Sequence, residues 1–196
     1  AQVAAIRFAT PRSRYEFEVL VDFLDRETAE IDAFIADQEE LITLLTERRA
    51  ATISHAVTKG LDPTAPMKVS GVEWLGDVPT HWKVISLKWL ATIRTGGTPT
   101  GNEVFSSESG IPWLRPDDLD ESGGSSLATR WITIDASLQL KAVAPGSTLV
   151  CGIGATLGKV GYVNDRVYFN QQLTAVQPIS AHPRFMYYLL YAARDE

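Results

Sequence analysis

The stretch that decides the architecture of this chain runs from Phe23 to Leu61, with the sequence FLDRETAEIDAFIADQEELITLLTERRAATISHAVTKGL. It contains no proline, and its single glycine, Gly60, stands at its end. Apolar residues recur in it at steps of three, four and seven, which is the spacing of one face of an α-helix. The same pattern extends back to Tyr15. We therefore predict one continuous helix over residues 14–59, roughly 69 Å long at the standard rise per residue.

Both ends of this helix carry the expected signals. Ser13 followed three residues later by Glu16 is a possible capping box, in which each side chain satisfies a free backbone N–H group. At the other end Lys59 complements the helix dipole, and Gly60 followed by Pro63 ends the helix.

Written as heptads, one side of the helix forms a seam that can face a partner helix. We predict that this seam pairs with a second long helix, either from the same subunit or from a second copy of the chain. Long amphipathic helices occur in many unrelated proteins, so the helix alone does not name a function. The predicted pairing residues are Leu24, Ile31, Phe34, Gln38, Leu41 and Leu45.

The composition is that of a chain with one globular domain and an extended element. It has 196 residues, of which 45% are hydrophobic, and a single cysteine, Cys151, which cannot form an internal disulfide. No apolar run is long enough to be a membrane span or a secretory signal, so we expect no membrane partner and a cytoplasmic location.

The net charge of −6 counts against a protein that grips DNA phosphates along a whole face, because such proteins are usually basic. The acidity lies mainly in the first 70 residues. A module that contacts bases while a partner subunit holds the phosphates could carry this charge.

After the helix the composition changes, and residues 60–82 contain three prolines and two tryptophans. We predict a linker there, pinned to a neighbouring surface by Trp74 and Trp82. From residue 83 onward, short apolar or alternating runs bounded by Gly, Pro, Asn and Ser predict β-strands, and Pro183–Ala193 predicts a helix. The predicted fold class is therefore α+β: one long coiled-coil-type helix, then a mostly β domain with a C-terminal helix. The predicted strands cover residues 84–93, 113–114, 130–134, 148–153, 160–163 and 173–177.

The glycine-rich stretch Gly152–Lys159 suggests a nucleotide-binding loop, but it matches neither standard pattern. The third glycine of a dinucleotide fingerprint is replaced by Leu157, and the first glycine of a phosphate loop is replaced by Ile153. We therefore predict a turn between two strands and no cofactor; a turn that approaches DNA closely stays open.

No enzymatic or metal-binding pattern stands out in the chain. The histidines and the cysteine lack metal-ligand spacing, and an amino-methyltransferase motif would need adjacent prolines, which do not occur. The acids of Asp117–Glu121 could hold a metal ion, but acids in a polar loop are usually solvated. We predict no catalytic residue and no metal site.

Two loops are rich in groups suited to nucleic acid. The loop Thr95–Asn102 offers hydroxyls and backbone N–H groups, and Asn170–Gln172 offers amides that can pair in two directions with adenine; Arg115 and Lys159 are possible cationic companions. Ordinary turn residues are the alternative for each, because Gly, Thr and Asn are common in turns. The candidate DNA-binding residues are Thr95, Gly97, Thr98, Thr100, Asn102, Arg115, Lys159, Asn170, Gln171 and Gln172.

Several of these segments together resemble the specificity subunits of type I restriction-modification enzymes. The resemblance is carried by 23–32, by 53–61 followed in tandem by 71–82, and further along by Gly96–Pro99, by Ile111–Leu114 with Asp118–Leu119, by the 154–158 turn and by 170–173. It covers nearly the whole chain.

The resemblance implies a subunit in which two target-recognition domains, separated by long antiparallel helices, each read one half of a bipartite DNA site. Catalysis, S-adenosylmethionine and ATP would then belong to separate modification and restriction subunits. It implies the tail of a preceding recognition domain at 1–13, a spacer helix at 14–59, a linker at 60–82 and a target-recognition domain at 83–196 that continues beyond Glu196. Two alternatives stay open: a coiled-coil interaction protein without a DNA role, and an S-adenosylmethionine-binding methyltransferase fragment.

Overall fold

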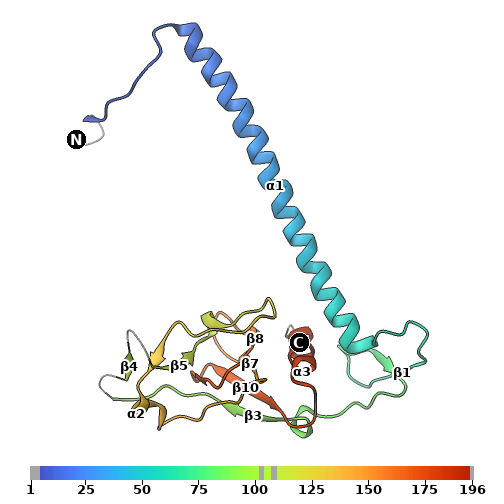
Figure 1. Cartoon of the computed structure of the whole chain (residues 1–196). Coiled ribbons are helices and arrows are strands. Elements are labelled where there is room, and N and C mark those ends of the chain that lie inside the picture. Colours follow the sequence, from blue (N-terminus) through green and yellow to red (C-terminus); the bar gives the residue numbers. More distant parts are fainter. Residues whose placement is uncertain (1–4, 102–103, 107–109, 195–196) are drawn as a thin grey trace. The chain divides into compact units, whose positions relative to one another are not determined.

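A computed structural model describes residues 5–101, 104–106 and 110–194 (Figure 1). The chain divides into two compact units, one ending at Arg49 and the other beginning at Ala50, and the helix α1 crosses this boundary. The first unit holds most of α1. The second holds the end of α1, short β-strands and a C-terminal helix. The predicted α+β class is thereby confirmed.

The helix α1 spans Arg14–Lys59, which are the predicted bounds. The hydroxyl of Ser13 accepts the N–H of Glu16 at 3.2 Å, so the predicted cap is present on that side. Gly60 has φ +79°, a conformation that side-chain-bearing residues rarely adopt, and this ends the helix.

The segment predicted as a linker contains a small hairpin, formed by β1 (Met67–Val69) and β2 (Asp77–Pro79). The ammonium group of Lys59 donates to the carbonyls of Leu75 and Asp77, so the last residue of α1 is tied to the second strand of the hairpin.

Just after the helix, hydrogen bonds from the hydroxyl and the N–H of Thr64 hold the pKa of Asp62 below its usual range.

Two four-stranded sheets build the globular part. The first is antiparallel, in the order β3-β10-β7-β8. The second has the order β4-β6-β5-β9, with β5 and β9 parallel. The strands are β3 (Ala91–Thr95), β4 (Phe105–Ser106), β5 (Ile111–Leu114), β6 (Trp131–Ile132), β7 (Thr148–Cys151), β8 (Val160–Tyr162), β9 (Tyr168–Phe169) and β10 (Leu173–Pro178).

Two predicted strands differ from the structure. In the run 84–93 only the end is a strand, and the 3₁₀ helix η2 (Leu87–Trp89) precedes it. In the run 130–134 the strand stops at Ile132, because the hydroxyl of Thr133 accepts the N–H of Ala136 and begins the short helix α2 (Ile134–Ser137). Local side-chain capping overrides strand propensity there.

The core lies between the sheets and under the C-terminal helix α3 (Pro183–Ala192). Leu114, Leu149 and Leu173 are fully buried and share one cluster. Tyr187 and Tyr191 of α3 pack against β8, and α3 runs alongside the first sheet (Figure 1). Within the described residues, no helix is long and apolar enough to cross a membrane.

Candidate nucleic-acid interface

The strand order of the first sheet brings three loops to one edge. Thr95, at the end of β3, pairs with Thr174 near the start of β10. Leu173, which starts β10, pairs with Cys151 at the end of β7. Consequently the segments 96–101, 170–172 and 152–159 all leave the sheet on the same side. Most of the predicted DNA-binding residues lie in these three segments.

The first loop packs closely against the turn between β9 and β10. The N–H of Gly96 donates to the carbonyl of Leu173 at 3.1 Å, and the N–H of Gly97 donates to that of Phe169 at 2.9 Å. A Cβ atom added to Gly96 would overlap the backbone oxygens of Phe169 and Asn170, so only glycine fits at that position.

Side chains fix the rest of this loop. The indole N–H of Trp113 donates to the carbonyl of Gly97 at 3.0 Å. The side-chain amide of Gln139 accepts the N–H of Thr100 and donates to its carbonyl, both at 3.0 Å. Thr95, Thr98 and Thr100 are exposed on the loop so formed. The predicted residue Asn102 lies outside the described residues.

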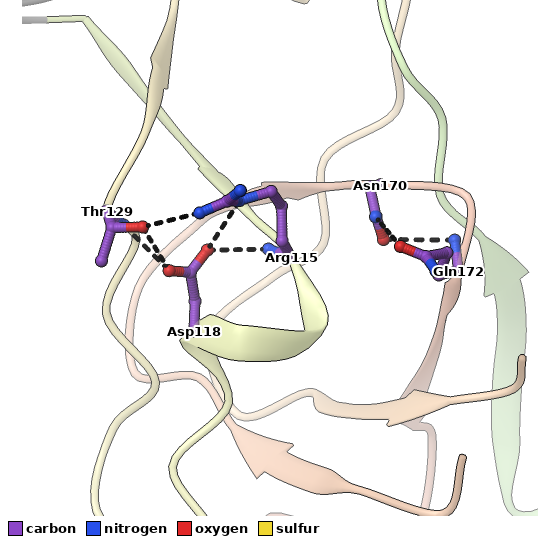
Figure 2. Close-up of polar contacts among 5 residues, drawn as sticks. All are labelled: Arg115, Asp118, Thr129, Asn170 and Gln172. Carbon is purple, nitrogen blue, oxygen red and sulfur yellow. Dashed lines mark hydrogen bonds and ion pairs between the residues drawn. The ribbon is translucent and has the colours of Figure 1, made fainter. Parts of the chain in front are cut away.

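The turn 170–172 separates its three amides into different environments, and Figure 2 shows two of them, Asn170 and Gln172, hydrogen-bonded to each other. Asn170 is buried, its Nδ2 donates to Gln172 Oε1 at 2.8 Å, and its Oδ1 accepts the N–H of Gln172 at 3.1 Å. Gln171 is exposed, and its Oε1 accepts the hydroxyl of Thr98. The turn therefore presents Gln171, while the side chain of Asn170 shapes the backbone around it.

The glycine-rich segment is a turn between β7 and β8, as predicted. The N–H of Gly152 donates to the carbonyl of Gln172 at 2.9 Å, so this turn is joined to the neighbouring one. At its tip the side chains of Ile153 and Leu157 are exposed. Lys159, half-buried at its base, shares a shallow depression with the ion pair of Glu121 and Arg194, whose charged atoms are 3.4 Å apart.

Arg115 follows β5 directly, next to the point where β9 ends, because the N–H of Asn170 donates to the carbonyl of Leu114. Its guanidinium nevertheless turns away from the amide turn, toward Thr129 (Figure 2). The carboxylate of Asp118, in the 3₁₀ helix η3 (Pro116–Asp118), accepts the N–H of Arg115 at 2.8 Å and the hydroxyl of Thr129 at 2.6 Å.

The expectation that the Asp117–Glu121 acids are solvated is wrong for Asp118, whose side chain is 1% exposed. A carboxylate is stable there because it accepts three hydrogen bonds and lies 3.9 Å from Arg115 Nε. The described residues include no group of histidine, cysteine or acidic side chains that could hold a metal ion.

Sequence reasoning missed two residues at this edge. Gln139, just after α2, holds Thr100 but is 39 residues away in sequence, so only the fold brings the two together. Arg94 is exposed on β3, two residues before the segment 96–101. A basic residue next to a glycine- and threonine-rich loop was a signal available in the sequence.

Comparison with protein families matches residues 79–195 to the type I restriction modification DNA specificity domain. The match covers more than half of the chain. This chain belongs to that family. The resemblance noted in the sequence is therefore confirmed. No curated protein matches the chain significantly.

Solved structures share the fold of this specificity domain. The HsdS subunit from Thermoanaerobacter tengcongensis is 18% identical with a TM-score of 0.53, and the match covers 90% of this chain and 40% of that one. A chain from a structural study of complex assembly and conformational transition of the type I R-M system is 20% identical, also with a TM-score of 0.53, over 86% of this chain and 40% of that one. The chain thus spans about two fifths of the length of these relatives.

Proposed function

We propose that this chain reads one half of a bipartite DNA site as part of a type I restriction-modification specificity subunit. Its partners would be double-stranded DNA and the modification and restriction subunits, which would carry the catalysis. The proposal is carried by the three joined turns at one edge of the first sheet, together with the family of residues 79–195.

The roles of the individual residues follow from their exposure. Gln171 and Thr98 are exposed and hydrogen-bonded to each other, and both side chains offer donors and acceptors suited to base edges. Thr95 and Thr100 offer further hydroxyls. Asn170, which is buried, would position the turn without touching DNA. Gly97, which has no side chain, would let the backbone of the loop come close to the DNA.

The cationic residues would serve the phosphates. Lys159 and Arg94 lie at the same sheet edge, whereas the guanidinium of Arg115 is already held by Asp118 and Thr129. Two side chains neutralise few phosphates, and the whole chain carries a net charge of −6. Because phosphate contacts supply most of the non-specific affinity for DNA, a partner subunit would provide many of the phosphate contacts.

The helix α1 would be the spacer, and its seam would pair with a second long helix. The predicted seam residues are exposed in the unit that ends at Arg49, as Ile31 at 58% and Phe34 at 64% illustrate. An isolated helix gains little stability from propensity alone, so a partner that covers these side chains is expected. In this assignment 1–13 is the tail of a preceding recognition domain, 60–82 the linker and 83–196 the recognition domain.

The test is selection of duplexes from a random pool by the chain together with its modification subunit, followed by binding measurements at low salt. We expect enrichment of one short sequence, which Gln171→Ala abolishes. Asn164→Ala is the matched control, because Asn164 is an exposed amide beyond the opposite end of β8. Equal affinity for every sequence would favour a coiled-coil interaction protein without a DNA role.

A further inference from the structure

The turn between β9 and β10 carries three side-chain amides, and the backbone fixes the orientation of the first of them. Oδ1 of Asn170 accepts the backbone N–H of Gln172 at 3.1 Å. A backbone N–H group only donates, so the oxygen of the Asn170 amide must face it and the nitrogen must face the other way. The orientation of the Asn170 side chain is therefore determined.

Asn170 passes this orientation on to the side chain of Gln172. Nδ2 of Asn170 donates to Oε1 of Gln172 at 2.8 Å, and Figure 2 shows both hydrogen bonds between the two residues. An amide nitrogen donates and does not accept, so only the oxygen of the Gln172 amide fits against it. The acceptor of Gln172 is thus held by the protein, and the two N–H groups on its Nε2 are left to donate elsewhere.

These donors are accessible at the candidate interface. Among the described residues, no acceptor bonds to Nε2 of Gln172, and the buried side-chain atoms without a partner belong only to Arg115 and Thr148. Nε2 of Gln172 is therefore open to solvent. It lies next to the glycine-rich turn, where a Cβ atom added to Gly154 would be 3.3 Å from it. The missing side chain at Gly154 leaves the donors uncovered on that side.

The neighbouring amide, Gln171, is not fixed in this way. Its Oε1 accepts the hydroxyl of Thr98. A hydroxyl both donates and accepts, so the amide of Gln171 can turn over and still bond to Thr98. Gln171 keeps both directions of pairing, whereas Gln172 keeps only one.

The base edges in the major groove differ in how well they fit a group that only donates. Guanine presents two adjacent acceptors, O6 and N7, whereas adenine has an amino donor beside its N7 and cytosine presents an amino donor. Thymine presents one acceptor beside a methyl group. A glutamine that pairs with adenine needs its own oxygen as an acceptor, and that oxygen of Gln172 already accepts from Asn170. Guanine is therefore the base that fits the donors of Gln172 best.

We propose that Gln172 recognises a guanine of the half-site through the N–H groups of its side chain, and that Asn170 sets this preference by holding the oxygen of Gln172. The inference rests on the DNA-reading function proposed above, and it names one base and the residue that reads it. Asn170 is a positioning residue, because its buried side chain contacts Gln172 and not DNA.

The test starts from the duplex that the chain selects together with its modification subunit, and replaces each guanine in turn with 7-deazaguanine. This base still pairs with cytosine but carries a C–H group in place of N7. We expect one position at which the replacement weakens binding at least about fivefold, as one lost hydrogen bond should. Fluorescence anisotropy measures the difference.

Two variants assign this effect to its residue. Gln172→Leu has no side-chain donor and should bind the guanine and 7-deazaguanine duplexes equally. Gln177→Leu is the matched control, because Gln177 is also half-buried but lies toward the other end of β10. It should keep the fivefold preference of the original chain.

Asn170→Asp tests the positioning role. A carboxylate accepts the backbone N–H of Gln172 but offers no donor, so the amide of Gln172 should turn over and present Oε1 outward. A new selection should then replace that guanine with adenine or cytosine, the bases that present an amino donor. A merely structural role for Asn170 would weaken binding without changing the selected base. Urea unfolding shows whether this variant folds, and Gln172→Leu decides the inference if it does not.

Other results would overturn the inference. If the selected sequence contains no guanine, or if no 7-deazaguanine weakens binding, Gln172 does not read guanine. If Gln172→Leu keeps the preference, another residue reads that base. In each of these cases the proposed DNA recognition still stands. If no sequence is selected at all, the proposed function fails and the inference fails with it.

Discussion

Gln139 and Thr100 exchange two hydrogen bonds, in which the side-chain amide of Gln139 pairs with the backbone N–H and C=O of Thr100 at 3.0 Å each. The side-chain amide of Gln139 makes the two backbone hydrogen bonds that a neighbouring β-strand would otherwise make with Thr100. It holds the far end of the loop 96–101, whose near end is fixed by the backbone hydrogen bonds of Gly96 and Gly97.

Replacing Gln139 with alanine should loosen this loop without unfolding the domain. Each lost hydrogen bond is worth about 1 kcal/mol, so the amide of Thr100 should exchange with solvent roughly tenfold faster or more. Hydrogen exchange of the free protein checks this without any DNA. Leu138→Ala, an exposed neighbour, should leave the exchange unchanged. Unchanged protection in Gln139→Ala would mean that the pair does not order the loop.

Replacing Gln171 or Thr98 tests base recognition. If the pair contacts base edges, Gln171→Ala or Thr98→Val should weaken binding to the cognate duplex by about 1–3 kcal/mol and leave binding to unrelated duplexes unchanged. Fluorescence anisotropy with both duplexes measures the difference. A uniform loss on all sequences would assign these residues to phosphate contact instead.

The buried carboxylate of Asp118 should matter for stability. Asp118→Ala leaves the N–H groups of Arg115 and Thr129 without an acceptor, and should lower the free energy of unfolding by about 2–4 kcal/mol. Urea unfolding measures this change. Asp117→Ala, at an exposed neighbouring position, should change it by less than about 0.5 kcal/mol. Equal effects would contradict the role given to the buried network.

The glycines of the candidate interface should differ sharply in tolerance. A Cβ at Gly96 overlaps backbone oxygens that cannot move freely, whereas a Cβ at Gly152 comes no closer than 3.9 Å to its neighbours. Gly96→Ala should therefore cost about 1–3 kcal/mol of stability and displace the loop, while Gly152→Ala stays within about 0.5 kcal/mol. Thermal unfolding of the two variants compares them directly.

A charged side chain in the seam of α1 should disrupt the proposed pairing with a second helix. Ile31→Asp places a carboxylate on the apolar face and should abolish the proposed helix pairing, measured by analytical ultracentrifugation, whereas Ala36→Asp, on the opposite side of the heptad, should leave it measurable. Both variants should keep the urea transition of the unit that begins at Ala50. Equal binding by the two variants would refute the seam assignment.

The long helix and the fold class follow from local signals in the chain. Periodicity, the Ser13 cap and Gly60 act within a few residues of one another, and the observed bounds of α1 are the predicted ones. The family likewise was recognisable from short motifs. Strand bounds were less predictable, because the Thr133 cap competes with strand formation at Ile134.

The arrangement of the candidate site depends on contacts between distant residues. Topology joins the loop after Thr95 to the turn at Asn170, and it places Gln139 against Thr100. Burial separates amides that look equivalent in sequence, because the β5–β9 pairing draws Asn170 inward and leaves Gln171 in solvent. Burial also makes Asp118 an internal acceptor. Local sequence encodes which groups are available, and long-range packing decides which of them face outward.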